Sequence, residues 1–276
     1  MAIDRIIIPT DFSTCADRAL ELALSMATKD LSELIICHIN PVAAGGDAMF
    51  FINAEILDRT EKEVDQSFRE LLDKFPKLKQ VSHKFVQTTG FSVDKIRDVA
   101  EEEMADLMIM GTKGRNNRIG EFFGSVASGI MKRSDIPILI VPENAQVESI
   151  KSILLALDFE DEHQQEGTKV LNAIATTLQS ELHIVNVIKD LAPSEVSLNQ
   201  AQMSHYDAEL PHIDHHYHFV NDDDIEHGIT QYALENEIQM IALIGRSYRF
   251  IDRLFHKSLS KKLSYHTTLP LLVLPK

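Results

Sequence analysis

The chain has little cysteine, little positive charge and no long apolar segment, and each shortage excludes a class of protein. Two cysteines in 276 residues do not make a disulfide framework, and Cys15 and Cys37 are interpreted as small packing residues. No apolar run reaches the roughly 20 residues that span a membrane. Asp4 and Arg5 stand where a signal peptide would have its apolar core. We therefore expect a cytoplasmic protein with no membrane partner.

The deficit of positive charge excludes a further class of protein. Lysine and arginine number 27 against 42 aspartates and glutamates, which gives a net charge of −15. A protein that binds DNA or RNA needs a basic surface for its sequence-independent affinity, so nucleic acid is not an expected partner. A single nucleotide in a locally favourable loop is compatible with this charge. The length and a hydrophobic content of 44% describe a globular protein of one large or two medium domains.

An internal repeat favours two domains. The segment RIIIPTDF at 5–12 returns as SILLALDF at 152–159, and IPILIVP at 136–142 returns as LPLLVLP at 269–275. Each half alternates short apolar runs with helical periodicities. This pattern is typical of βαβ units and of a parallel sheet that is buried on both faces.

We predict two α/β domains, residues 1–146 and 147–276, that differ in one helix. Apolar residues at helical spacing in the first half indicate a helix that begins near Ser13, a long middle helix, and a third helix behind the turn at Gly90. The second half repeats the first and third patterns. Its middle helix is reduced, because residues 189–211 include two prolines and hold at most a short or irregular segment.

The first half contains a spaced glycine motif. Gly111 and Gly114 follow an apolar strand pattern, and nine residues later Gly124 and Ser125 precede a helical pattern. Glycine lets a phosphate approach the backbone without a Cβ in the way, and the first N–H groups of a helix favour an anion. A lone Gly-x-x-Gly more often only ends a strand and begins a helix, so the motif needs supporting context.

Two further loops supply that context, because ligands of open parallel sheets bind beyond the carboxyl ends of the strands. Residues 9–11 (Pro-Thr-Asp) end the first predicted strand, and residues 39–40 (Ile-Asn) end the second. A carboxylate at such a position can accept hydrogen bonds from ribose hydroxyls. Asp11 is therefore either a ribose ligand or the N-cap of the helix that follows it.

Taken together, these residues resemble the universal stress protein family in its tandem form, in which two such domains share one chain. The resemblance covers essentially the whole sequence. Its most specific element is the Gly-x-x-Gly, nine residues, Gly-Ser/Thr signature of the ATP-binding branch, which Gly111, Gly114, Gly124 and Ser125 match. It implies two Rossmann-like, adenine-nucleotide-hydrolase-like α/β domains, each with a five-stranded, mostly parallel sheet in the order 3-2-1-4-5 flanked by helices.

The resemblance also implies how the halves associate and what they bind. The last strands, 138–141 and 271–274, would pair antiparallel, so that one chain forms an intramolecular pseudo-dimer, with a further homodimer left open. The first half would bind ATP, with Mg²⁺. Asp11 would hold the ribose, and Ile39 would meet the adenine through its main chain. The glycine loop would hold the phosphates.

The ATP-binding residues that the resemblance implies come from all three loops. They are Pro9, Thr10, Asp11, Ile39, Met110, Gly111, Thr112, Lys113, Gly114, Arg115, Gly124, Ser125 and Val126. The side chains of Lys113 and Arg115 would either add positive charge or lie in solvent.

The second half departs from the signature. Tyr248 stands at the position of the second glycine, and Lys257 stands at that of the third. A Cβ at positions that need close backbone approach would obstruct a phosphate, so we predict one ATP site per chain. This segment is locally basic, which indicates either a solvated helix face, the favoured interpretation, or a different anionic ligand. Its basic residues are Arg246, Arg249, Arg253, Lys257, Lys261 and Lys262.

Four histidines crowd into residues 212–218, where the third strand of the second half is expected. Strand alternation would place Asp214, His216 and His218 on one face, where they could bind zinc. One strand supplies at most two or three ligands, however. Exposed histidines on an edge strand are therefore the favoured interpretation, and a metal site is the alternative.

The sequence favours a regulatory, stress-resistance protein that binds ATP in its first half and acts through a protein partner or through nucleotide occupancy. One alternative is a slow ATPase or a self-phosphorylating enzyme, with Ser125 or Thr112 as the acceptor. No dedicated base is evident beside the glycine loop, which argues against rapid hydrolysis. The other alternative is a scaffold that binds no nucleotide, with a metal or another anion in the second half.

Overall fold

The computed structural model describes residues 3–27, 33–41, 54–114, 123–157, 165–189, 200–244, 250–251 and 268–275. The strands are β1 (Arg5–Pro9), β2 (Glu33–Pro41), β3 (Ser82–Gly90), β4 (Leu107–Gly111), β5 (Ile138–Val141), β6 (Ser152–Ala156), β7 (Glu181–Ile188), β8 (His215–Asn221), β9 (Met240–Ile244) and β10 (Leu271–Leu274). The helices are α1 (Thr14–Met26), α2 (Ala54–Lys74), α3 (Ser92–Glu102), α4 (Ser125–Arg133), α5 (Gln165–Leu178), α7 (Gln200–Glu209) and α8 (Ile225–Glu235), with a 3₁₀ turn, η2 (Pro76–Gln80).

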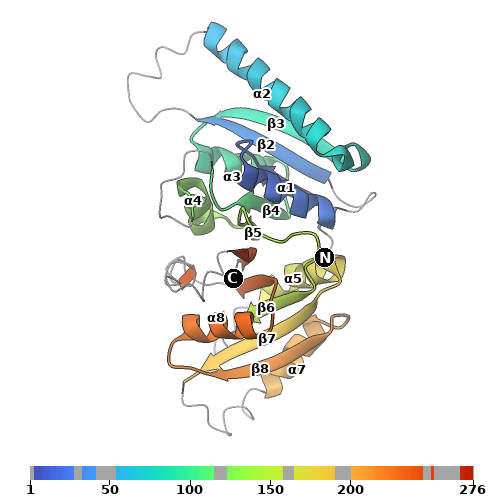
Figure 1. Ribbon diagram of the computed structural model, residues 1–276, viewed down its shortest axis with the longest axis vertical. Helices are drawn as coiled ribbons and strands as arrows, with labels where there is room; N and C mark the ends of the chain where they lie inside the picture. The colour runs from blue at the N-terminus through green and yellow to red at the C-terminus, as the bar shows by residue number, and fades with distance from the viewer. Residues whose placement is uncertain are drawn as a thin grey trace.

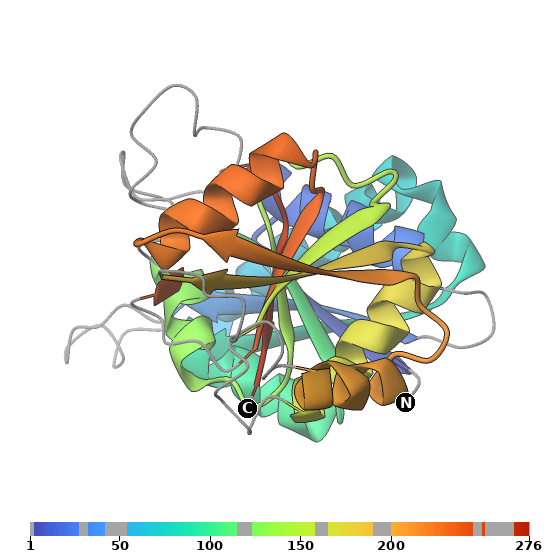
Figure 2. The same ribbon diagram turned by 90° about the horizontal axis from the view of Figure 1, so that it is seen from below.

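All ten strands form one sheet, in the order β3-β2-β1-β4-β5-β10-β9-β6-β7-β8. Within each half the strands are parallel and follow the order 3-2-1-4-5, which confirms the predicted fold class. The halves meet where β5 pairs antiparallel with β10, with Leu139 opposite Leu272. This is the expected intramolecular pairing (Figure 1). Strand twist accumulates along the sheet, so that the strands fan out when the molecule is viewed end on (Figure 2).

Helices cover both faces of the sheet, and alternate strand residues reach each layer. Ile6 and Ile8 of β1 pack in the layer that includes α1, α2, α5 and α7. Ile7 packs in the opposite layer, with α3, α4 and α8. This alternation explains the continuous apolar runs in the sequence, because both faces of a central strand are buried. Each of the two layers runs through both halves of the chain.

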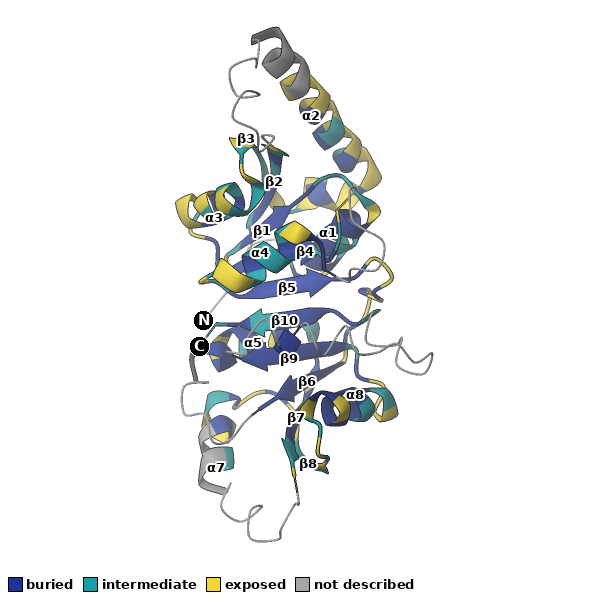
Figure 3. Ribbon diagram, turned by 90° about the vertical axis from the view of Figure 1, so that its left-hand side faces the viewer, coloured by how far each residue is buried: buried dark blue, intermediate teal, exposed yellow. Residues whose placement is uncertain are grey.

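The two outermost strands are the least buried part of the sheet. In Figure 3 the central strands are almost entirely buried, whereas β3 and β8 carry intermediate and exposed residues. The third strand of the second half begins at His215, not at His212 as the sequence pattern suggested. Before it, the Ile213 N–H donates to the Leu210 carbonyl over 3.3 Å, a local turn that a strand ladder would not allow.

The helices also follow the predicted pattern. The first begins after Ser13, whose hydroxyl accepts from the Ala16 N–H and caps α1. The middle helix shrinks from the 21 residues of α2 to the 10 of α7, the short segment expected within 189–211. Among the described helices, none is both long enough and apolar enough to cross a membrane.

Candidate functional site

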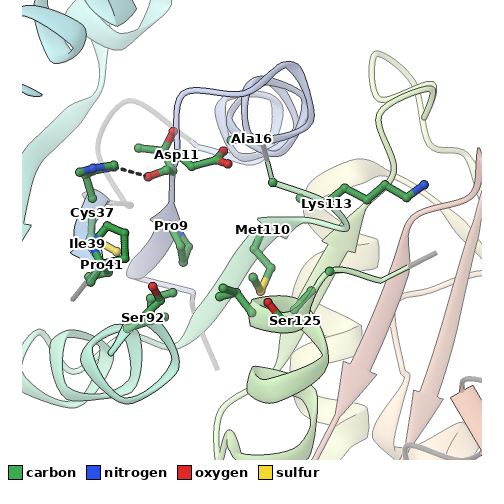
Figure 4. Close-up of a pocket in the computed structure, with 18 of the residues that line it drawn as sticks. Pro9, Asp11, Ala16, Cys37, Ile39, Pro41, Ser92, Met110, Lys113 and Ser125 are labelled. Atoms are coloured by element: carbon green, nitrogen blue, oxygen red, sulfur yellow. Dashed lines mark hydrogen bonds between the residues drawn. The ribbon is translucent and has the colours of Figure 1, made fainter. Parts of the chain in front are cut away.

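A cavity of about 480 Å³ lies at the carboxyl ends of β1, β2 and β4, beside the N-terminus of α4 (Figure 4). Of the thirteen ATP-binding residues expected from the sequence, twelve line it. The thirteenth, Arg115, lies outside the described residues. These strand ends converge because β1 lies between β2 and β4 in one parallel sheet. The twelve are Pro9, Thr10, Asp11, Ile39, Met110, Gly111, Thr112, Lys113, Gly114, Gly124, Ser125 and Val126.

The turn after β1 holds Asp11 in a fixed orientation. Its Oδ1 accepts from the Ser13 N–H over 3.2 Å and from the Ser13 hydroxyl over 2.6 Å. Because Ser13 caps α1, the sequence alternative of Asp11 as the N-cap is not the arrangement observed. The other oxygen, Oδ2, faces Gly114 on the glycine loop. A carboxylate held at one oxygen can accept hydrogen bonds from a ligand at the other.

Phe12 gives this turn its unusual shape. Its φ is 58°, in the left-handed region that bulky residues rarely adopt. The Phe12 N–H donates to the Thr10 hydroxyl over 2.9 Å. Its ring stacks on His38 with centroids 4.9 Å apart and meets Phe68 edge-on at 5.4 Å. These contacts hold the chain in a conformation that its backbone preference alone would not select.

The end of β2 presents main-chain groups to the cavity. The Cys37 carbonyl accepts from the Thr10 N–H over 2.8 Å, so the peptide groups of Cys37 point toward β1. Strand geometry repeats every two residues, so the peptide groups of Ile39 also point to the β1 side of β2. The ladder between β1 and β2 ends with the pair Pro9 and Cys37, so Ile39 lies beyond its paired part. The ring Nδ1 of His38 lies 2.8 Å from the Thr10 carbonyl. A carbonyl only accepts, so Nδ1 donates and ties the two strand ends together.

The first two glycines of the motif meet different demands. A Cβ on Gly111 would lie 2.8 Å from the Cys15 sulfur and 2.9 Å from its carbonyl carbon and oxygen. Gly111 therefore lets α1 pack closely on β4. A Cβ on Gly114 would lie 2.7 Å from Asp11 Oδ2, on the cavity side. The sequence pattern treats both glycines alike, whereas the structure separates a packing role from a cavity role.

The third glycine begins the helix that faces the cavity. Gly124 is the N-cap of α4 and makes no side-chain cap bond, and the first turn contains no acidic residue. Its N–H donates to the Thr112 carbonyl over 2.7 Å, which brings the two ends of the glycine loop together. Ser125, the first helical residue, is exposed at the cavity. A helix start of this kind attracts an anion through its N–H groups and its dipole.

Several lining residues escaped the sequence analysis. They are Ala16, Cys37, His38, Pro41, Ser92, Ile96 and Ala127. Ser92 could have been found, because it follows the end of β3 at the same edge of the sheet. Burial raises the pKa of the Cys37 thiol to about 12, which makes it a packing group. The Lys113 side chain extends away from Asp11 and Ile39 (Figure 4), in keeping with a solvated side chain.

The described residues of the second half show only part of the region that corresponds to this cavity. Leu157 replaces Thr10 in the repeat, and its N–H donates to the Val185 carbonyl over 3.0 Å. Asn186 replaces His38 and donates to the Leu157 carbonyl over 3.0 Å, so the two strand ends are tied in the same way. The altered glycine segment, with Tyr248 and Lys257, lies outside the described residues. The prediction of one site per chain therefore stays a prediction.

The histidine cluster lies at the far edge of the sheet. Asp214 and His216 approach each other, with 3.5 Å between Oδ1 and Nε2. His218 stands apart from that pair. Its ring stacks on His183 and leans on Tyr232, with centroid distances of 5.4 and 5.0 Å.

Comparisons with known proteins agree with this architecture. A family model described as the universal stress protein family matches residues 2–142 and again 149–275. Universal stress protein MJ0577 of Methanocaldococcus jannaschii is 26% identical over 151 residues, which are 50% of this chain and 93% of the relative. Universal stress protein Rv1636 of Mycobacterium tuberculosis is 27% identical over 146 residues, 51% of this chain and 97% of the relative.

Solved structures match the chain over its whole length. The crystal structure of a universal stress protein from Archaeoglobus fulgidus superposes with a TM-score of 0.73 at 15% identity, covering 100% of this chain and 99% of that one. One from Pseudomonas aeruginosa gives 0.60 at 16%, covering 99% and 94%. At this identity the likeness shows the fold alone. Because the family model matches both halves, the chain belongs to the universal stress protein family, with two of its domains in tandem.

Proposed function

We propose that the first half binds one adenine nucleotide, ATP with Mg²⁺, and that its occupancy serves a regulatory role in stress resistance. The observation that carries this proposal is the cavity that the three strand ends and the start of α4 enclose. Its volume of about 480 Å³ is in the range of small-ligand sites. It combines a fixed carboxylate, main-chain groups at the end of β2, and a helix N-terminus without a side-chain cap.

Each part suits one portion of the nucleotide. Asp11 Oδ2 would accept from a ribose hydroxyl, because Ser13 holds the other oxygen. The N–H and carbonyl of Ile39 would meet the adenine edge. The N–H groups at the start of α4 and the Ser125 hydroxyl would hold the phosphates, which approach closely beside Gly114. Bound Mg²⁺ would offset the phosphate charge.

Binding is favoured over rapid hydrolysis. Asp11 is the single carboxylate among the described residues that line the cavity, and Ser13 already engages one of its oxygens. Thr112 is buried, with its hydroxyl 3.5 Å from the Cys15 sulfur, so it is poorly placed to accept a phosphoryl group. Ser125 is exposed and is the better candidate for slow self-phosphorylation. We expect turnover well below about one per second.

The test measures binding, stoichiometry and turnover on the full chain. Isothermal titration with Mg-ATP should give one site per chain. Asp11→Asn should weaken binding about tenfold, because it replaces a charged hydrogen-bond acceptor with a neutral amide. Asp158→Asn, the matched change in the second half, should leave the affinity unchanged. Denaturation of the purified protein should also release ATP or ADP, which chromatography of the supernatant will detect.

Three results would contradict the proposal, each in a different way. No co-purified nucleotide and no change in melting temperature with Mg-ATP would favour the scaffold alternative. Two equivalent sites per chain would show that the altered glycine segment still binds ATP. Turnover of about one per second or faster would make the protein an enzyme.

A further inference from the structure

The outer strands of the second half carry a polar cluster where the first half is apolar. The cross-strand registers of β2 with β3 and of β7 with β8, together with the matching starts of α3 and α8, define equivalent positions. Three apolar side chains of the first half are replaced together by polar aromatic side chains in the second half. The pairs are Ile35 and His183, Val86 and His218, and Val99 and Tyr232.

The replacements contact one another. The Nδ1 of His183 lies 2.9 Å from the Tyr232 hydroxyl, and its Nε2 lies 3.4 Å from Glu181 Oε1. The ring of His183 stacks on that of His218. An imidazole held at one nitrogen thus fixes a carboxylate with the other. Metal sites use this type of support to orient their ligands.

The carboxylate that His183 holds belongs to a convergent group. Glu181, Asp214 and His216 each place one ligand atom within 4.8 Å of the others. His216 lies at the start of β8 and Asp214 directly precedes that strand, whereas Glu181 is the first residue of the neighbouring β7. The Leu182 N–H donates to the Asp214 carbonyl over 2.9 Å, which fixes the two strand starts side by side. A second strand therefore supplies the ligand that a single strand could not.

We propose that Glu181, Asp214 and His216 bind a divalent first-row transition metal, with zinc as the best chemical match. Two carboxylates offset the charge of the cation, and an imidazole favours zinc over magnesium or calcium, which prefer oxygen ligands alone. Ligand distances to zinc are about 2.0–2.2 Å, so two ligand atoms of one ion are at most about 4.4 Å apart, and the three exposed side chains draw together from separations of up to 4.8 Å when the metal binds. Water completes the coordination.

The first half provides an internal comparison. The positions of His183 and His216 are occupied there by Ile35 and Lys84. Lys84 is ion-paired with Glu103, and its positive charge would repel a cation. Among the described residues the site therefore belongs to the second half alone. It is separate from the proposed nucleotide site and does not depend on it.

Zinc chloride titrated into chelator-treated full chain, followed by calorimetry, tests the proposal. We expect one site per chain, and Glu181→Gln and His216→Ala should each weaken zinc binding about tenfold or more. His212→Ala is the matched control, because His212 is an exposed histidine two residues from Asp214 but outside the group, and it should bind zinc as the parent does. Asp11→Asn should also leave zinc binding unchanged.

Other outcomes overturn the proposal. They are no zinc binding by the parent chain, unchanged affinity in both Glu181→Gln and His216→Ala, or a loss confined to His218→Ala. The last result would place the metal on the stacked imidazoles instead. Glu181, His212 and His216 are exposed, so their variants should keep the melting temperature of the parent in the absence of zinc, which verifies that they fold.

Discussion

Alanine at Gly111 should destabilise the protein, whereas alanine at Gly114 should mainly weaken nucleotide binding. At Gly111 the added Cβ would lie 2.8 Å from the Cys15 sulfur and 2.9 Å from two backbone atoms of the same residue. Ordinary carbon contacts are about 3.5–4.0 Å, so α1 has to move away from β4. Overpacking of this kind costs about 1–3 kcal/mol.

The clash at Gly114 is different in kind. Its Cβ would meet one side-chain oxygen of Asp11, which can rotate away if it gives up its hydrogen bonds to Ser13. Gly114 is exposed, so the cost in stability should stay below about 1 kcal/mol. The cost in ATP affinity should be about tenfold, because the displaced carboxylate is the proposed ribose ligand.

The assays are thermal and urea unfolding, both monitored by circular dichroism, with ATP titration of the same variants. The melting temperature of Gly111→Ala should fall by about 2–4 °C per kcal/mol. Adding Cys15→Ala to the Gly111→Ala variant should restore only part of the lost stability, since two of the three close atoms belong to the Cys15 backbone. An unchanged unfolding midpoint for Gly111→Ala, or an equal loss for Gly114→Ala, would refute the division of roles between the two glycines.

Three further predictions concern other parts of the molecule. Cys37 should resist a thiol reagent at pH 8 in the native protein and react only on unfolding, because burial raises its pKa to about 12; rapid native labelling would contradict this. The side chain of His215 holds the pKa of Asp207 below its usual value, so this carboxylate contributes stability above about pH 4 that is lost as the pH falls through the lowered pKa. Asp207→Asn should therefore lose less stability between neutral and acid pH than the parent, as urea midpoints will show. Leu139→Ala and Leu272→Ala should each cost about 2–5 kcal/mol, and the double variant should cost less than their sum, since the two leucines face each other across the joint between β5 and β10. Additive losses in the urea unfolding of these variants would argue against that contact.

Most of the fold follows from local patterns in the sequence. Continuous apolar runs such as 6–8 and 107–110 indicate strands buried on both faces, and the repeat indicates two copies of one unit. The predicted start of the third strand in the second half, His212, was wrong by three residues. Polar, histidine-rich segments carry a weak alternation signal, and the turn that delays this strand depends on Leu210, a buried residue that the alternation does not report.

The candidate site was predictable where position along a strand decides it. Pro9, Asp11, Ile39 and the glycine motif all lie at or just beyond the carboxyl ends of strands, and parallel strands bring such ends to one edge. Lining residues such as Cys37 and Ile96 look like ordinary core residues in the sequence. Whether these residues line the cavity depends on how α3 packs on β2, and no local sequence pattern records that packing.

The sequence by itself determined the element types, the duplication and the strand ends at which a ligand would bind, because these depend on residue spacing along the chain. Only the tertiary structure decided which role each residue of these patterns has. In the structure Gly111 allows α1 to pack closely on β4, whereas Gly114 lies against Asp11 at the cavity. The sequence pattern grouped His218 with Asp214 and His216, whereas the structure places Glu181 beside these two residues. Both outcomes depend on distances between elements that lie far apart in the sequence, and such distances are set by sheet register and helix packing.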